Sequence, residues 1–144
     1  MLSCHQVADY ILAQVDPDAG DLISNLKLQK LIYYAQGFHL AIYGEPLFSE
    51  SIEAWTHGPV SPDLYHRFKD CESNPIPVPD EIDFSVYEQP VREFLDEVYS
   101  VFGQFSAWKL RNMTHDEPPW KEAAPNTVIT HDAMRAYFST QITE

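Results

Sequence analysis

The longest helical pattern in the chain runs from residue 25 to residue 43. Apolar side chains recur there at spacings of three and four, and further tyrosines extend the apolar stripe around most of the helix. Ser24 or Asn25 is expected to cap the N-terminus, and Gly44 to supply the left-handed residue that ends the helix. Gly37 favours close packing of another backbone against the helix. Because a helix that is apolar on most faces is usually buried, this segment is predicted to lie at the centre of the domain.

Shorter helices are predicted on both sides of this segment, where a helix-start residue precedes apolar positions at helical spacing. They are expected to begin at Ser3, Ser61-Pro62, about Gln89, Ser106 and Thr130. The prolines between residues 73 and 79 predict a stiff connector within one domain, and residues 114–120 predict a rigid turn.

Two short segments change from helical to extended patterning. Residues 47–48 and 52–56 are predicted to be extended and to pair in a small hairpin, with Gly58-Pro59 as punctuation after them. The predicted fold class is therefore mainly α: a compact single-domain helical fold over residues 1–144, with a minor short β-hairpin.

The charge of the chain limits its partners. The sequence has 22 Asp and Glu against 9 Lys and Arg, a formal net charge of -13. Such a surface repels phosphate backbones and anionic lipid, so we expect no direct nucleic-acid partner and no membrane partner. No apolar run is long enough for a transmembrane helix and no secretory signal begins the chain, so a cytoplasmic location is expected. A basic protein is the natural electrostatic complement.

Acidic residues are concentrated between positions 70 and 97. This stretch holds nine acids and one base, Arg92. One interpretation is a solvated face that keeps the protein soluble, and the other is a surface that steers a basic partner.

Six histidines raise the question of metal or catalytic chemistry. No two of them are three or four residues apart, and Cys4 and Cys71 form no paired motif. No glycine-rich phosphate loop is present either. We therefore predict no metal site, no cofactor and no catalytic residue.

The run His115-Asp116-Glu117 leaves a hydrolase as an enzymatic alternative. Adjacent residues on a turn point in different directions, and catalysis also needs a positioned nucleophile or substrate groove. We favour a structural interpretation, in which His115 and Asp116 bond backbone groups of the turn and Trp120 packs beneath it.

The segment ISNLKLQKLIYYAQG, at residues 23–37, resembles the Panacea domain, also called the SocA-like antitoxin domain. The resemblance continues through Gly44 and the short motifs PLF at 46–48, EAW at 53–55 and HGPV at 57–60. It resumes at SAW, residues 106–108, and at THDE and PW between residues 114 and 120. The similarity covers nearly the whole chain, although residues 71–87 carry no family motif.

The resemblance implies an antitoxin of a type II-like, two-gene toxin–antitoxin system. Members of the family neutralise unrelated protein toxins by direct binding, and many are carried on prophages. The expected partner is a cognate protein toxin encoded by the adjacent gene. At least one relative is an adaptor that delivers its toxin to an AAA+ protease of the ClpXP type, and this role is the main alternative. The oligomeric state stays open.

Aromatic and charged side chains near loops are the candidate toxin contacts, because such residues dominate protein interfaces. The candidates are Glu53, Trp55, His57, Asp63, Tyr65 and Trp120. Other positions that match the family pattern are predicted to hold the fold: Leu28, Lys30, Tyr33, Tyr34, Gly37, Gly58, Pro59, Trp108, Thr114 and His115. Since core residues and interface anchors share the same chemistry, a structural role also stays open for the candidate contacts.

Overall fold

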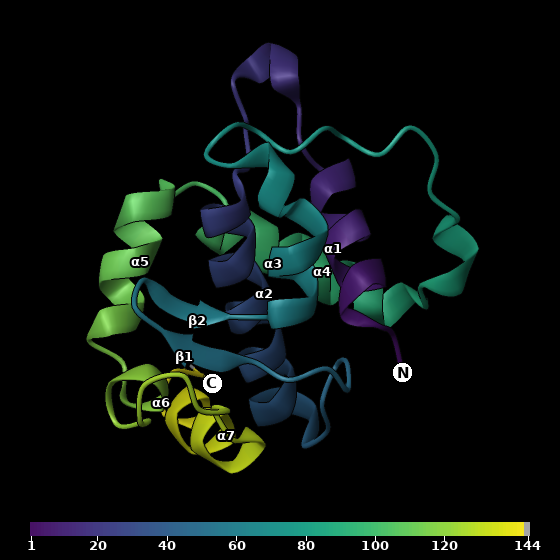
Figure 1. The fold of residues 1–144 in the computed structure, drawn as a ribbon. Helices are drawn as coiled ribbons and strands as arrows, with labels where there is room; N and C mark the ends of the chain where they lie inside the picture. The colour runs from purple at the N-terminus through teal and green to yellow at the C-terminus, as the bar shows by residue number, and fades with distance from the viewer. Residues whose placement is uncertain (143–144) are drawn as a thin grey trace.

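A computed structural model describes residues 1–142 as a mainly helical fold with one small hairpin (Figure 1). The α-helices are α1 (Cys4–Ala13), α2 (Asn25–Tyr43), α3 (Pro62–Phe68), α4 (Gln89–Phe102), α5 (Ala107–His115), α6 (Pro118–Lys121) and α7 (His131–Ser139). Short 3-10 turns are η1 (Pro17–Ala19), η2 (Lys69–Cys71) and η3 (Phe84–Val86), and the strands are β1 (Glu53–Trp55) and β2 (Gly58–Val60). The predicted fold class is confirmed.

Helix α2 is the centre of the fold, as its apolar pattern predicts. It contacts α1, α3, α4, α5, α7 and β2, and the other elements surround it in Figure 1. Gly37 faces the ring of Phe138 on α7, and a Cβ at that position would collide with the ring. Close packing at Gly37 is therefore present, although the neighbour is an aromatic side chain rather than a backbone.

Side-chain caps fix where the helices begin. Ser3 and Gln6 form a reciprocal capping box at the start of α1. At four other helices the capping hydroxyl accepts a hydrogen bond from a backbone N–H in the first turn: Ser24, Ser61, Ser106 and Thr130. Gly44 ends α2 in the left-handed conformation, with φ of 74°. These predicted boundaries are confirmed.

The hairpin pairs different segments from those predicted. Strand β1 pairs with β2 in antiparallel register, with Glu53 opposite Val60 and Trp55 opposite Gly58. Residues 47–48 lie outside any strand because the Gln36 side chain from α2 satisfies their backbone groups. Its Oε1 accepts from the Leu47 N–H at 2.7 Å, and its Nε2 donates to the Phe48 carbonyl at 2.8 Å. The expected pairing of 47–48 with 52–56 is therefore wrong.

The segment before α7 covers the other edge of β1. The backbone N–H of Ala54 donates to Thr127 O at 2.9 Å, and Ile129 N–H donates to Ile52 O at 2.8 Å. The predicted rigid turn over residues 114–120 is also corrected: Thr114 and His115 complete α5, and the prolines that follow begin α6. Proline is tolerated in a first helical turn because its missing N–H has no intrahelical partner there.

The connector between α3 and α4 is irregular, as its prolines predict. It is attached to the body of the protein by a hydrogen bond from Ile76 N–H to Ile23 O at 2.8 Å, and the Ile76 side chain is buried. Among residues 1–142, no helix combines the length and apolar character needed to cross a membrane.

Candidate functional site

A groove of about 650 Å³ opens where the start of α2, the hairpin, α3 and the start of α5 meet. We call it the hairpin groove. Its walls combine aromatic, imidazole and amide groups, which suits contact with another polypeptide. The lining residues used below are Asn25, Gln29, Trp55, His57, Tyr65 and Lys69.

The start of α2 supplies a rigid polar wall to the hairpin groove. Asn25 Oδ1 accepts from Gln29 Nε2 at 2.9 Å, and Gln29 Oε1 accepts from the Ser61 N–H at 2.8 Å. Both side chains are buried and hydrogen-bonded, so they hold the hairpin and the start of α3 against α2.

Four of the six candidate contact residues come together at this groove. Trp55 and Tyr65 pack edge to face, with ring centroids 5.0 Å apart, and the Trp55 indole N–H donates to Glu53 Oε1 at 3.0 Å. Tyr65 is 38% exposed and His57 is exposed on the hairpin turn. Glu53 orients the indole, while the other three side chains line the groove.

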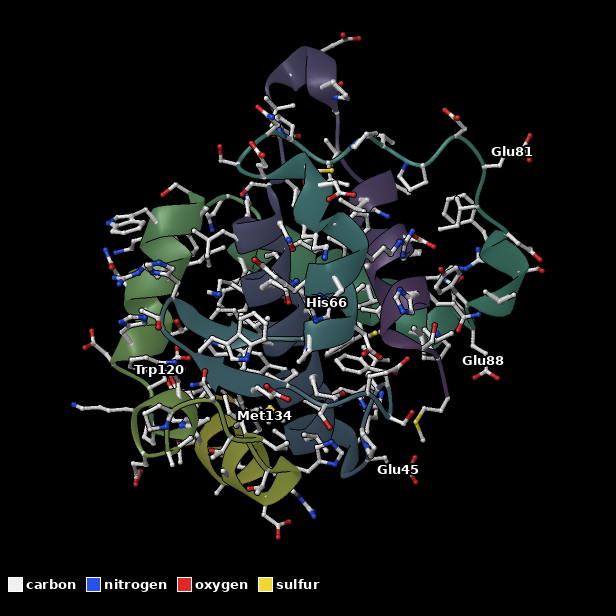
Figure 2. All side chains as sticks on the ribbon, viewed as in Figure 1. Glu45, His66, Glu81, Glu88, Trp120 and Met134 are labelled. Carbon is white, nitrogen blue, oxygen red and sulfur yellow. The ribbon has the colours of Figure 1, made fainter. Side chains whose placement is uncertain are left out.

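The other two candidates lie elsewhere. Trp120 is half-buried near the start of α6 (Figure 2), stacks on His115 at 3.9 Å and donates from its indole N–H to Trp55 O at 2.7 Å. It supports the hairpin from beneath. Asp63 is exposed on α3, where its carboxylate lies near Cys4, His5 and Glu50.

The base of the hairpin rests on a buried ammonium group. Lys30 is fully buried, and its Nζ donates to Pro59 O at 3.1 Å. Burial, with a smaller contribution from the charge of Arg111, lowers the pKa of Lys30 to about 7. Gly58 has φ of 112°, and a Cβ there would lie 2.8 Å from both Lys30 Cε and Thr114 Oγ1. Lys30 and Thr114 thus pack beneath the hairpin, against β2.

A buried carboxylate attaches the junction of α5 and α6 to α2. Glu117 Oε1 accepts from Tyr33 OH at 3.0 Å, and Oε2 accepts from Tyr34 OH at 2.8 Å. Burial raises the pKa of Glu117, and the hydrogen bonds from Tyr34 and Tyr33 partly offset that rise. The sequence placed Glu117 in a candidate acid/base run, and it could not indicate this structural role because the tyrosine partners are more than 80 residues away.

His115 does not make the turn hydrogen bond that we expected. Within residues 1–142, its Nε2 is buried without a hydrogen-bond partner, and its ring is stacked on Trp120. Burial lowers the pKa of His115, with a further lowering from Arg111 and Lys30, so the neutral imidazole is favoured. The predicted packing of Trp120 against this segment is present, although His115 ends α5 and Trp120 lies in α6 rather than in a rigid turn.

Helix α5 adds two side chains beside the hairpin groove that our contact prediction omitted. Trp108 was predicted to hold the fold, yet its side chain is 56% exposed. The Arg111 guanidinium lies 4.5 Å above the Trp108 ring, and its Nε donates to His57 Nδ1 at 3.3 Å. The tryptophan falls on the outer side of an amphipathic helix, and helical spacing could have revealed its exposure.

A second depression of about 580 Å³ lies between the C-terminal half of α2 and α4. Phe38, Ile42 and Phe94 contribute to its apolar lining, and the lining also contains Glu93 and Glu97. Part of the predicted acidic stretch therefore borders an apolar surface.

The model of the antitoxin SocA-like, Panacea domain family matches residues 28–121, which include Trp55, His57, Tyr65 and Trp108. This chain belongs to the SocA-like antitoxin family. Membership of an antitoxin family favours a binding role over a catalytic one. The resemblance predicted from the sequence motifs is confirmed.

A curated relative agrees with the SocA-like assignment. Antitoxin SocA of Caulobacter vibrioides (strain NA1000 / CB15N) is 52% identical over 46 residues, a segment that is 32% of this chain and 24% of the relative. The match thus spans about a quarter of the relative's length. No solved structure is significantly similar to the chain.

Proposed function

We propose that this SocA-like chain is an antitoxin that neutralises a cognate protein toxin by direct binding at the hairpin groove. The observation that carries the proposal is the convergence of four aromatic or imidazole side chains from the family-matched range on one exposed site. Trp55 and His57 come from the hairpin, Tyr65 comes from α3, and Trp108 comes from α5.

The construction of the site supports a binding role. Aromatic side chains supply large contact areas at low entropic cost, and clustered aromatics with an arginine are typical anchors of protein interfaces. Trp55 is oriented by Glu53, and Arg111 is held between Trp108 and His57. Since buried contacts hold the hairpin in place, the anchors are ordered before a partner arrives, which lowers the entropic cost of association.

The central experiment is co-expression of the chain with the product of the neighbouring open reading frame. We expect the neighbour to arrest growth, and the chain to restore growth and to co-purify with it. A neighbour that is harmless, or that is toxic but neither bound nor rescued, would contradict the proposal.

The adaptor role gives a different result in the same experiment. Growth would be restored without a stable complex, the neighbour would be degraded, and the protection would disappear in a host that lacks the ClpX-type unfoldase. Protection that persists in that host, with a stable complex, would favour direct blockade instead.

Two tyrosines allow a matched test of the surface. Tyr65 is 38% exposed at the hairpin groove, and Tyr43 is 51% exposed at the α2–α4 depression. We expect Tyr65→Ala to weaken toxin binding by about 10- to 30-fold, as interface anchors do. Tyr43→Ala should bind within about 2-fold of the parent, and both variants should retain the parental circular dichroism. Equal losses in both, or a loss confined to Tyr43→Ala, would place the interface elsewhere.

A further inference from the structure

We propose that Cys4, His5, Glu50 and Asp63 form a binding site for a divalent transition-metal ion, Zn²⁺ by preference. One ligand atom from each residue, a thiol sulfur, an imidazole nitrogen and two carboxylate oxygens, lies within 4.8 Å of the other three. The four residues come from three places in the fold: the first turn of α1, the loop after α2, and the first turn of α3. This site is separate from the hairpin groove.

The donor set fits zinc. Zn²⁺ takes four ligands of the Cys, His and carboxylate types in tetrahedral geometry, with bonds of roughly 2.0–2.3 Å. Tetrahedral bonds of that length place the ligand atoms roughly 3.3–3.8 Å apart. The ligand atoms are now separated by up to 4.8 Å, so reaching the tetrahedral distance requires a movement of about 1 Å. Side-chain rotation can supply this movement because Asp63 is exposed and His5 and Glu50 are half-buried.

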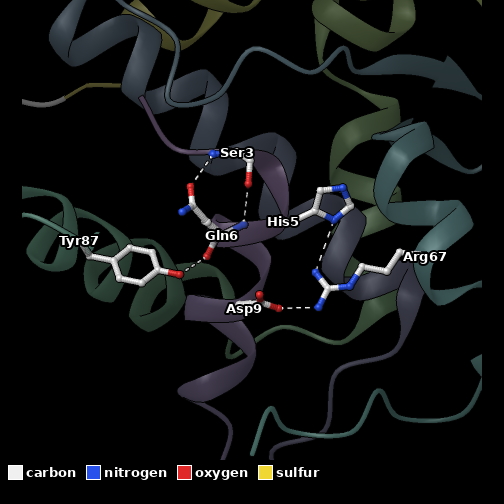
Figure 3. Close-up of polar contacts among 6 residues, drawn as sticks. All are labelled: Ser3, His5, Gln6, Asp9, Arg67 and Tyr87. Carbon is white, nitrogen blue, oxygen red and sulfur yellow. Dashed lines mark hydrogen bonds and ion pairs between the residues drawn. The ribbon is translucent and has the colours of Figure 1, made fainter. Parts of the chain in front are cut away.

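The local backbone already holds the ligands together. The Ser3–Gln6 capping box fixes the first turn of α1, from which His5 projects (Figure 3). Cys4 is the first residue of the same turn. Glu50 Oε1 accepts from the backbone N–H of Cys4 at 3.1 Å, so the loop after α2 is attached to the same turn. The site is therefore largely preorganised, which lowers the cost of binding an ion.

The charge at the cluster favours a cation. Within residues 1–142, neither Glu50 nor Asp63 has a salt-bridge partner. Arg67 lies near His5, with Nη1 3.5 Å from Nδ1, but its Nη2 is paired with Asp9 at 2.7 Å (Figure 3). Burial and the Glu50 carboxylate raise the pKa of the Cys4 thiol to about 12, which keeps it protonated. A bound dication stabilises the thiolate, and the thiol proton leaves to solvent when the metal–sulfur bond forms.

Four protein ligands leave no open position, so the ion has a structural role rather than a catalytic one. Cys4 and His5 lie outside the family-matched range, and Glu50 and Asp63 lie inside it. The ion would thus attach α1 to the matched part of the fold. The sequence analysis did not identify this set because its members are far apart in the chain. Cys4 and His5 are adjacent, but Glu50 lies 45 residues after His5 and Asp63 lies 13 residues after Glu50. None of these is the short paired spacing that is typical of zinc sites. Our prediction that the chain has no metal site is replaced here by this proposal.

The test is titration of metal-free chain with Co²⁺ and Zn²⁺, with the second cysteine as the control. We expect one equivalent of Co²⁺ to bind and to produce a sulfur-to-cobalt charge-transfer band with the intense visible absorption of tetrahedral cobalt. Cys71→Ser should retain the band, and Cys4→Ser should lose it. Zn²⁺ should displace the cobalt and should raise the melting temperature of the parent and of Cys71→Ser, because it binds the folded state.

The exposed ligand keeps the test informative if Cys4→Ser unfolds. Asp63→Asn removes a ligand from the surface, and it should fold normally and weaken Zn²⁺ binding by at least about 10-fold, since even outer partners of metal sites contribute that much. His5→Gln should behave in the same way, while His66→Gln, on α3, serves as its control. No charge-transfer band in the parent, a band that depends on Cys71, or Zn²⁺ affinity unchanged in Asp63→Asn and His5→Gln would each overturn the proposal.

Discussion

The amino group of Lys30 is buried in the interior and donates to a single carbonyl. Its only hydrogen bond among the described residues goes to Pro59 O, and burial lowers its pKa from 10.5 to about 7. Between those two pH values the unfolded chain binds more protons at this residue than the folded chain does. The free energy of unfolding therefore rises as the pH rises through this range. This residue lowers the stability of the protein at neutral pH, where part of the buried lysine population is charged.

We predict that Lys30 gives the protein a measurable increase in stability between pH 7 and pH 9. The expected rise in the free energy of unfolding is roughly 2 kcal/mol, from urea titrations at the two pH values. Lys30→Met should remove the rise, whereas Lys121→Met, at an exposed position on α6, should retain it. The pH slope is the readout because loss of the bond to Pro59 O also changes the absolute stability. A slope that survives in Lys30→Met would show that other groups cause it.

At the scale of elements, contact between α2 and α7 depends on a missing side chain. The Phe138 ring occupies the space that a Cβ of Gly37 would fill. The same ring packs edge to face on Tyr33, with centroids 5.3 Å apart, and at an angle of 56° on Phe38 at 4.8 Å. A helical glycine normally costs about 1 kcal/mol relative to alanine. We expect the contact with α7 to outweigh that cost.

We predict that Gly37→Ala destabilises the protein by roughly 1–3 kcal/mol despite its better helix propensity, because overpacking displaces the Phe138 ring. Phe138→Leu in the same chain should recover part of the loss, so that the double variant is more stable than the sum of the single effects predicts. The measurement is a double-mutant cycle of urea unfolding. Additive losses would mean that Gly37 and Phe138 are not coupled.

Elements that depend on local chemistry were predictable from the sequence, and those that depend on distant partners were not. The caps at Ser3 and Ser24 lie within three residues of the N–H groups that they accept from. The strand partner of β1 could not be predicted in this way, because the Gln36 side chain from α2 holds residues 47–48 out of the sheet. Helical spacing alone identifies α5, but not the neighbours of its outer face.

The same difference explains what the sequence revealed about the candidate site. Trp55, His57 and Tyr65 were found because they lie within or beside recognisable motifs, and the fold brings them to one groove. Asp63 has the same kind of motif context, yet α3 directs it toward Cys4 instead. Proximity across three segments of the chain depends on how the helices pack, and no periodicity in the sequence encodes it.

On the scale of the whole molecule, the negative charge and the hairpin groove are expected to affect different steps of binding. The net charge of -13 produces a long-range field, while the groove itself is lined by both Lys69 and Glu72 and has Arg111 beside it. Long-range fields increase encounter rates, and desolvated anchors slow dissociation. If the proposed toxin is basic, the acidic surface increases its association rate and the aromatic residues lower its dissociation rate.

This division of roles predicts that two classes of variant change different rate constants. Replacing Glu93 and Glu97, which line the α2–α4 depression, by glutamine should lower the association rate with the cognate toxin and leave the dissociation rate nearly unchanged. Tyr65→Ala should raise the dissociation rate and leave association nearly unchanged. Surface-plasmon resonance at low and physiological salt measures both rates. The association rate of the parent should fall several-fold as salt rises, because the Debye length shortens from about 30 Å at 0.01 M to about 8 Å at 0.15 M. A salt-independent association rate would show that the acidic surface serves solubility alone.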